Sequence, residues 1–237
     1  MSKFHLADRE PVALAIEAAN RANTLKELYD EISAYKGHDV AEMRPYTPSQ
    51  GVMTSSPLMI VTEKPEKEDL DQKRPFSGEY GAIMRNAAGM IGVDLDECHI
   101  SYAIHWTPEG DKSPNKTQIA ASRPFLYREI ELVRPRAILA QGRAVIESLA
   151  NYRGSVLDIY GQTMRFQHEN LDVPMFLTAH PAYCLYSSTY FSTFMENTKE
   201  FFQRYGKAEE NTLPGSVRQQ ASVHADTDLT FKRIKAA

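Results

Sequence analysis

The hydrophobic pattern alternates between short apolar runs and longer segments of helical periodicity. Four short runs are suited to buried strands, at 58–62, 99–104, 137–140 and 175–178. Between and after them, the pattern predicts helices over 79–92, over 117–133, from Gly142 onwards and over 189–205. An earlier segment, 9–36, also has apolar residues at helical spacing. The chain therefore reads as strands alternating with helices.

Such an alternation is typical of a parallel sheet that is covered by helices on both faces. We expect an α/β protein with three α/β/α layers around a central, mostly parallel four-stranded sheet. Residues 1–24 are interpreted as a partly helical N-terminal extension, 25–205 as the α/β domain, and 206–237 as a flexible polar tail. Ligand sites in these sheets lie beyond the carboxyl ends of the strands, so the segments that follow each strand are the places to look for function.

Composition adds limits to this picture. The 237 residues contain no apolar run long enough for a transmembrane helix, and residues 1–10 lack the apolar stretch of a secretory signal. Two cysteines, Cys98 and Cys184, do not make a disulfide framework, so we expect a cytoplasmic protein and treat it as a monomer. The net charge of −4 is not that of a protein that coats nucleic acid, but a site-specific DNA enzyme needs only a local basic rim.

Four segments at the predicted strand ends resemble the motifs of a known family. Residues 62–69 read TEKPEKED and 73–81 read KRPFSGEYG, and they are similar, without a gap, to GEAPGxxED followed by GRPFxGxAG. Residues 102–108, YAIHWTP, resemble a strand-Asn-x-x-Lys motif with a proline-rich loop, and 180–186, HPAYCLY, resemble HPAYLLR. These are motifs of the iron–sulfur branch of the uracil-DNA glycosylases. The resemblance covers about residues 25–205 and implies a glycosylase fold and DNA as the partner.

The resemblance assigns catalytic roles to three residues and base stacking to a fourth. It implies that His180 donates a hydrogen bond to the base as the glycosidic bond breaks, and that Glu63 and Asp69 contact the base and position water near the sugar. It implies that Phe76 stacks on the flipped base. The alternatives are a structural histidine, a solvated acidic loop, and a loop aromatic that packs in the core.

The resemblance assigns further positions to contacts with the substrate and with DNA. Lys64 and Pro65 lie in the first motif, where Lys64 either carries an amine close to the sugar for imine chemistry or forms a surface pair with Glu63. Leu185 and Tyr186 stand where the family inserts a side chain into the minor groove, although Leu185 also suits core packing.

Two weaker DNA contacts complete the candidate set. Lys112 lies in the proline-rich loop after the second strand, where residues 111–114 resemble the family's NRxP, and the resemblance implies a DNA contact. Gly142 opens a helix after the third strand, whose start could present backbone N–H groups to a DNA phosphate, although a plain turn explains the glycine equally well.

The sequence departs from the family most clearly at its cofactor. An iron–sulfur cluster of this kind needs four thiolates, and the chain has two cysteines. Trp106 and Ser122 stand where the later two ligands fall, and residues 37–38 lie near the upstream pair. We therefore predict that the cluster is absent, and we expect no metal and no other cofactor.

The base-reading positions also differ. Tyr102 replaces an asparagine that pairs with the uracil edge, and Glu66 replaces a glycine that allows close backbone approach. His105 takes the place of the motif lysine. Loss of paired hydrogen bonds should alter base preference strongly.

Three hypotheses follow. The first is a DNA glycosylase that flips a base and hydrolyses its N-glycosidic bond, with a preference shifted away from uracil. The second is a weakly active or inactive DNA-binding relative that acts in replication, repair or phage DNA modification. The third is an unrelated nucleotide-binding module, against which stand the four ordered motifs and the lack of a glycine-rich phosphate loop.

Overall fold

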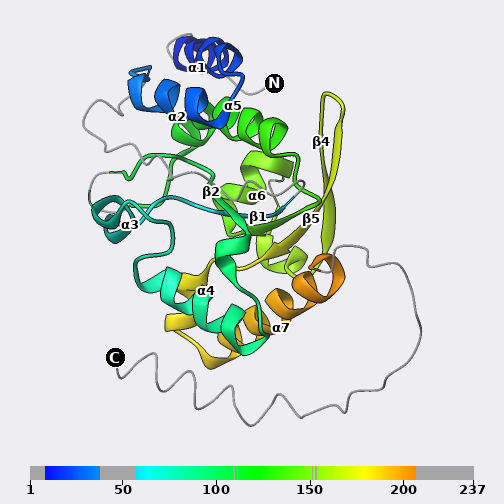
Figure 1. Ribbon diagram of the computed structural model, residues 1–237. Helices are drawn as coiled ribbons and strands as arrows, with labels where there is room; N and C mark the ends of the chain where they lie inside the picture. Colours follow the sequence, from blue (N-terminus) through cyan, green and yellow to red (C-terminus); the bar gives the residue numbers. More distant parts are fainter. Residues whose placement is uncertain are drawn as a thin grey trace.

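The computed structural model describes residues 9–37, 57–108, 110, 112–150, 152 and 154–206. Within these ranges the chain forms a five-stranded sheet with the order β2-β1-β3-β5-β4 (Figure 1). The strands are β1 (Leu58–Thr62), β2 (His99–Tyr102), β3 (Ala137–Gln141), β4 (Thr163–His168) and β5 (Leu171–Thr178). The first three and β5 pair in parallel, so their carboxyl ends meet at one edge of the sheet.

The predicted fold class is confirmed, but the predicted strand count of four was wrong. The missed strand, β4, runs antiparallel to β5 at the sheet edge, and the two form a hairpin around Glu169, whose φ is +48°. Only Phe166 of β4 is buried, and most of its other side chains are exposed. A strand that is solvated on one side carries no continuous apolar run, which explains why the pattern did not reveal it.

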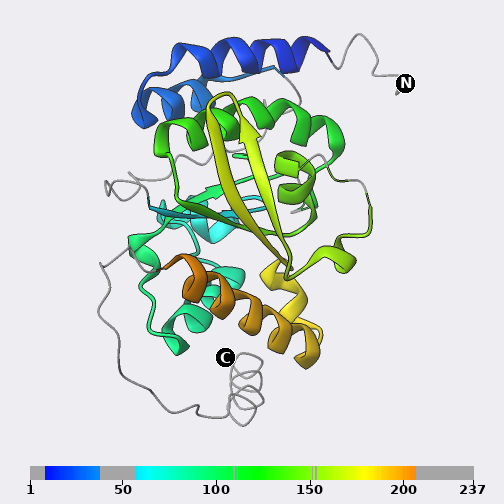
Figure 2. The same cartoon turned by 90° about the vertical axis from the view of Figure 1, so that its right-hand side faces the viewer.

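Helices cover both faces of the sheet, as Figures 1 and 2 show. Leu58 and Ile60 of β1 face α4 (Glu79–Met90) and α7 (Ser188–Tyr205), and they share one core cluster with both helices. The alternate residues, Met59 and Val61, join a second core cluster with α5 (Lys116–Val133) and α6 (Arg143–Ala150). This period-two division of β1 places the central strand between the two helical layers.

The N-terminal segment forms two helices rather than the single stretch predicted over 9–36. Between α1 (Arg9–Arg21) and α2 (Leu25–Ala34), the Thr24 hydroxyl accepts a hydrogen bond from the Glu27 N–H and begins the second helix. Both helices pack outside α5 and share a third core cluster with it (Figure 2). Part of the predicted extension, 1–24, is thus packed onto the α/β layers.

Short helical elements lie between the main ones. They are α3 (Lys67–Gln72), η3 (Leu95–Glu97), η5 (Val156–Ile159) and η6 (Pro181–Leu185). The predicted tail, apart from Gly206, lies outside the described residues. In the part of the chain that the structure describes, no helix combines the length and apolar character needed to cross a membrane.

Candidate active site

Glu63, Gly142 and His180 meet at the carboxyl edge of the sheet. They follow β1, β3 and β5 closely, and these three strands are neighbours in the sheet. A methyl group on the α-carbon of Gly142 would lie 2.6 Å from Glu63 Oε1 and 3.0 Å from the β-carbon of His180. The two predicted catalytic groups therefore pack against the same glycine, which has no side chain to separate them.

The Gly142 turn depends on backbone freedom. Its φ of +92° lies in the left-handed region, and its N–H donates to the Thr178 carbonyl at 2.9 Å. The N–H of Gly142 itself is thus occupied by β5, and the predicted contact between this helix start and a DNA phosphate remains a prediction. In the structure, the lack of a side chain at Gly142 allows the close approach of Glu63 and His180.

Glu63 caps helix α6. Its Oε1 accepts a hydrogen bond from the Ala144 N–H at 3.1 Å. The positive end of a helix dipole favours a negative group at this place. The structure thus directs the Glu63 carboxylate across the sheet edge, from the loop after β1 toward the residues that follow β3 and β5.

His180 is oriented by its own backbone. It is 9% exposed, and its Nδ1 accepts a hydrogen bond from the Ala182 N–H at 3.2 Å, as the N-cap of η6. A neutral imidazole whose Nδ1 accepts carries its proton on Nε2, so Nε2 is the donor. The ring of Tyr80 meets the His180 ring edge to face, with centroids 5.1 Å apart. Tyr80 was not among the predicted site residues, although it stands at an alanine position of the family motif.

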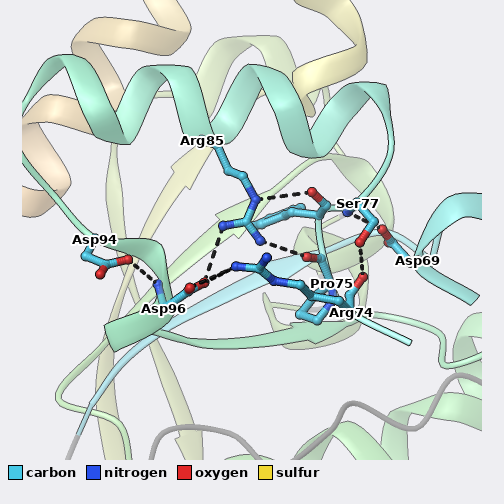
Figure 3. A network of polar contacts seen from close by, with 8 residues as sticks. Asp69, Arg74, Pro75, Ser77, Arg85, Asp94 and Asp96 are labelled. Atoms are coloured by element: carbon cyan, nitrogen blue, oxygen red, sulfur yellow. Dashed lines mark hydrogen bonds and ion pairs between the residues drawn. The ribbon is translucent and has the colours of Figure 1, made fainter. Parts of the chain in front are cut away.

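Asp69 ties together the loop after β1. It is 1% exposed and accepts a hydrogen bond from the Ser77 N–H at 2.7 Å (Figure 3). It also accepts from the Glu66 N–H at 3.1 Å and the Tyr102 hydroxyl at 2.9 Å. Burial raises the pKa of Asp69, and the hydrogen bonds from Ser77 and Glu66 lower it in part. These contacts give Asp69 a structural task in the loop, and its predicted role in positioning water remains a prediction.

Phe76 occupies a strained position within the same loop. Its φ is +57°, it is 4% exposed, and its side chain belongs to the core cluster shared by α4 and α7. Arg85 of α4 donates to the carbonyls of Phe76 and Pro75 at 3.4 and 3.2 Å (Figure 3). Asp96 in turn binds Arg85 at 3.3 Å and Arg74 at 2.8 Å. This network holds the loop and explains how a non-glycine residue keeps a left-handed conformation. Stacking of Phe76 on a base remains a prediction.

Two departures from the family motifs are built into the loop. Tyr102 is fully buried, and its hydroxyl is directed to Asp69 rather than presented at a surface. The Glu66 carboxylate accepts from the N–H groups of Tyr80 and Gly81, at 3.4 and 3.3 Å, at the start of α4. Burial raises the pKa of Glu66 to about 7, partly offset by the hydrogen bond from Tyr80. Both side chains therefore support the loop.

The other predicted contacts are dispersed. The carbonyl of buried Pro65 accepts from the Thr107 hydroxyl at 3.0 Å and joins two motif loops, and Lys64 beside it is partly buried. Lys112 is exposed. Leu185 packs against the core cluster, whereas Tyr186 is 79% exposed.

A buried polar network lies under helix α5. Glu129 is fully buried and accepts from Tyr29, His99 and His105 at 2.8, 2.8 and 3.0 Å, and from Ser101 at 2.5 Å. Burial alone would raise the pKa of Glu129, but hydrogen bonds and charge from His105 and His99 bring it below its ordinary value. The sequence placed His105 close to the catalytic residues, whereas the structure uses it in this core network.

Aromatic rings occupy the region in which the family would hold its cluster. Trp106 packs against Tyr35 and Phe125 with ring centroids 5.6 and 5.8 Å away, and Tyr35 and Phe125 are 5.1 Å apart. Trp106 is 2% exposed and Phe125 is fully buried. These residues offer no thiolate and fill the space with side chains.

The two cysteines do not supply the missing ligands. Cys98 and Cys184 belong to the core cluster on the opposite side of the sheet from the aromatic group. Burial raises the pKa of each thiol to about 12, which disfavours the thiolate form that binds metals. Within the described ranges no group of three or more metal-binding side chains occurs. The residues present therefore do not fit the family's cluster.

The fold and the site together define an α/β protein in which His180 and the Glu63 carboxylate lie close together at the carboxyl edge of the parallel strands. The chain belongs to the Uracil DNA glycosylase superfamily, whose family model matches residues 48–205.

Individual relatives agree with this assignment. A type-4 uracil-DNA glycosylase of Pyrobaculum aerophilum is 26% identical over 159 residues, which cover 65% of this chain and 81% of that protein. One from Sulfurisphaera tokodaii is 23% identical over 171 residues, 70% of this chain and 77% of that protein. A DNA polymerase of Bacillus phage SP01 is 25% identical over 113 residues, which cover 44% of this chain and 12% of the polymerase.

Proposed function

We propose that this protein is a DNA glycosylase that flips a base out of DNA and hydrolyses its N-glycosidic bond. The observation that carries the proposal is the packing of Glu63 and His180 against Gly142, which leaves no room between them for even a methyl group. Superfamily membership supports DNA as the substrate. We treat the protein as a monomer in this reaction.

The geometry suggests a division of work between the two groups. In the proposed reaction the Nε2–H of His180 donates to the carbonyl oxygen of the leaving base, which gains negative charge as the bond from C1′ to nitrogen breaks. A hydrogen bond from a neutral imidazole stabilises that anion without a full proton transfer. The Glu63 carboxylate stabilises the positive charge on the sugar and orients the water that adds to C1′. Phe76 is proposed to stack on the base from the loop.

The proposal includes a base preference shifted away from uracil. A buried Tyr102 hydroxyl bound to Asp69 cannot supply the paired donor and acceptor of a carboxamide. A site that lacks such a pair discriminates less strongly for the uracil edge. Tyr80, which packs on His180, adds bulk beside the same catalytic group.

We also propose that the protein works without an iron–sulfur cluster. The aromatic packing around Trp106 and the burial of both cysteines support this. Purified protein should lack the visible absorbance of an iron–sulfur cluster. Brown protein with stoichiometric iron and sulfide would contradict this part of the proposal.

The experiment that tests the activity uses single- and double-stranded oligonucleotides that carry uracil, hydroxymethyluracil or hypoxanthine. After incubation, alkali cleaves any abasic site, and the fragments are resolved on a gel. Excision should occur and should be lost in His180→Ala. The control is His168→Ala, because His168 lies on edge strand β4 and contacts Glu131 at 3.2 Å. Absence of excision for every base would reject the glycosylase function.

A second function, a DNA-binding relative without efficient catalysis, is favoured by the loop after β1. Glu66 places a carboxylate where the family motif has glycine, and this group caps α4. A polymerase is among the relatives, which fits a role in replication. Tight DNA binding without excision of any base would support this function over the first.

A further inference from the structure

Three exposed tyrosines gather on one segment beside His180. Among the large hydrophobic side chains exposed in the described ranges, Tyr183 is 42%, Tyr186 79% and Tyr190 37% accessible. They lie on η6, on its C-cap and in the first turn of α7, within ten residues of His180. Exposed aromatic rings are costly to keep in water and commonly mark a binding surface.

The arrangement of these tyrosines is compact. The rings of Tyr183 and Tyr190 lie 5.7 Å apart at an angle of 43°, so each supports the other. The N–H of Tyr186 donates to the Tyr183 carbonyl at 3.2 Å, which closes the turn between η6 and α7. Because His180 is the N-cap of η6, the histidine and the tyrosines are held on one rigid segment.

A fourth tyrosine connects this surface to the catalytic residues. Burial raises the pKa of Tyr160, and the nearby Tyr183 and Glu63 raise it further, whereas Arg143 lowers it. Tyr183 and Glu63 therefore both belong to the electrostatic surroundings of Tyr160. The Tyr160 hydroxyl is buried and has no hydrogen-bond partner among the described residues. Such an atom is typical of a place where a ligand or water completes the bonding.

We propose that Tyr183, Tyr186 and Tyr190 form a stacking surface for unpaired DNA bases that flank the flipped nucleotide. The protein would therefore bind single-stranded DNA in preference to duplex DNA. This inference rests on the proposed function, because the surface is assigned to DNA through its continuity with His180 and Glu63.

The chemistry of the surface favours unpaired bases. Aromatic side chains stack on the faces of bases whatever their sequence, and those faces are accessible only when the strand is not paired. A wedge into duplex DNA needs one inserted side chain, whereas three exposed rings on one segment suit several unpaired bases of a single strand. Arg143 is exposed at the start of α6, near Tyr160, and supplies a positive charge for a phosphate.

The test measures binding by fluorescence anisotropy with a labelled strand of about 15 nucleotides, alone or annealed to its complement. The full chain should bind the single strand more tightly than the duplex. Tyr183→Ala and Tyr190→Ala should each weaken single-strand binding by about tenfold or more, with a smaller change for the duplex. Tyr190→Phe should bind as the parent does, because the ring remains.

A matched control separates stacking from general loss of apolar surface. Leu14 is 43% exposed on α1, so Leu14→Ala removes a similar exposed group from another part of the fold and should leave binding unchanged. Equal affinity for single-strand and duplex DNA would overturn the proposal. Wild-type affinity in the Tyr183→Ala and Tyr190→Ala double variant would also overturn it.

Separate measurements of binding and excision distinguish a failure of this inference from a failure of the proposed activity. Excision is scored on strands that carry a modified base, and binding is scored on unmodified strands. Tyrosine-dependent single-strand binding without excision would uphold the surface and reject the glycosylase. Excision that is unchanged in the double tyrosine variant, with unchanged binding, would uphold the glycosylase and reject the surface.

Discussion

Replacing Gly142 with alanine tests the site geometry most directly. The new methyl group would lie 2.6 Å from Glu63 Oε1 and 3.0 Å from the β-carbon of His180, both too close for contact. The β-carbon of His180 is fixed to the backbone, whereas the Glu63 carboxylate is the end of a flexible side chain and is the group that can move. We expect Glu63 to be displaced from the Ala144 N–H.

The magnitude follows from two contributions. The left-handed conformation at φ +92° costs an alanine about 1–2 kcal/mol. Loss of the Glu63 cap adds about 1 kcal/mol. We therefore expect Gly142→Ala to lower the free energy of unfolding by about 2–3 kcal/mol. Because a misplacement of about 1 Å at a reacting group can reduce rate by about 100-fold, excision should fall by about that factor.

The chain offers a matched control. Gly92 has a φ of +72°, but a methyl group there would meet nothing within 4 Å. Gly92→Ala should therefore show the backbone cost alone, about 1 kcal/mol less than Gly142→Ala, and no loss of excision. Urea unfolding gives the free energy of unfolding of both variants, provided that the dependence of that free energy on urea concentration (the m-value) is the same for both. Equal destabilisation of the two variants, with excision retained in Gly142→Ala, would refute the reasoning.

Three further predictions concern stability. Glu129→Ala leaves the four donors that converge on Glu129 without their acceptor. It should lower the free energy of unfolding in urea by about 3–5 kcal/mol, and a decrease below about 1 kcal/mol would contradict the network. Tyr102→Phe removes the hydroxyl that Asp69 accepts and should cost about 1.5–3 kcal/mol, so parental stability would argue against that bond. Burial raises the pKa of Glu66 from 4.5 to about 7, so the folded state retains this proton more strongly than the unfolded chain. The resulting stabilisation is complete below the unfolded value and is lost as pH rises through about 7, so the parent should lose more stability than Glu66→Gln between about pH 5 and about pH 8. Parallel pH profiles for the two proteins would contradict that shift.

The elements of the fold were largely decided by local sequence. Helix α5 was predicted over 117–133 and spans Lys116–Val133, because apolar spacing along one segment is enough to define an amphipathic helix. The apolar run of β1 likewise predicted a strand that is buried on both faces. Edge strand β4 was missed because only Phe166 of its six residues is buried, so it carries no apolar run, even though its partner β5 follows directly in a hairpin.

The Glu129 network could not be predicted from local sequence patterns, because its members come from distant segments of the chain. Its members come from α2, β2, the loop after β2, and α5, and one contact spans 100 residues of sequence. Each residue alone reads as an ordinary polar side chain. Only the packing of α5 over β2 turns them into one buried cluster, since a buried carboxylate requires several donors at once.

By itself the sequence determined four of the five strands and the motifs that follow them, and the resemblance of those motifs to a known family identified His180 and Glu63 as site candidates. Tertiary structure decided what those residues do with their neighbours: the Gly142 N–H bonds to β5, the Tyr102 hydroxyl turns to Asp69, and Tyr80 packs on His180. The physical reason is that strand and helix periodicity are local, whereas hydrogen-bond partners are set by which chain segments the sheet brings side by side.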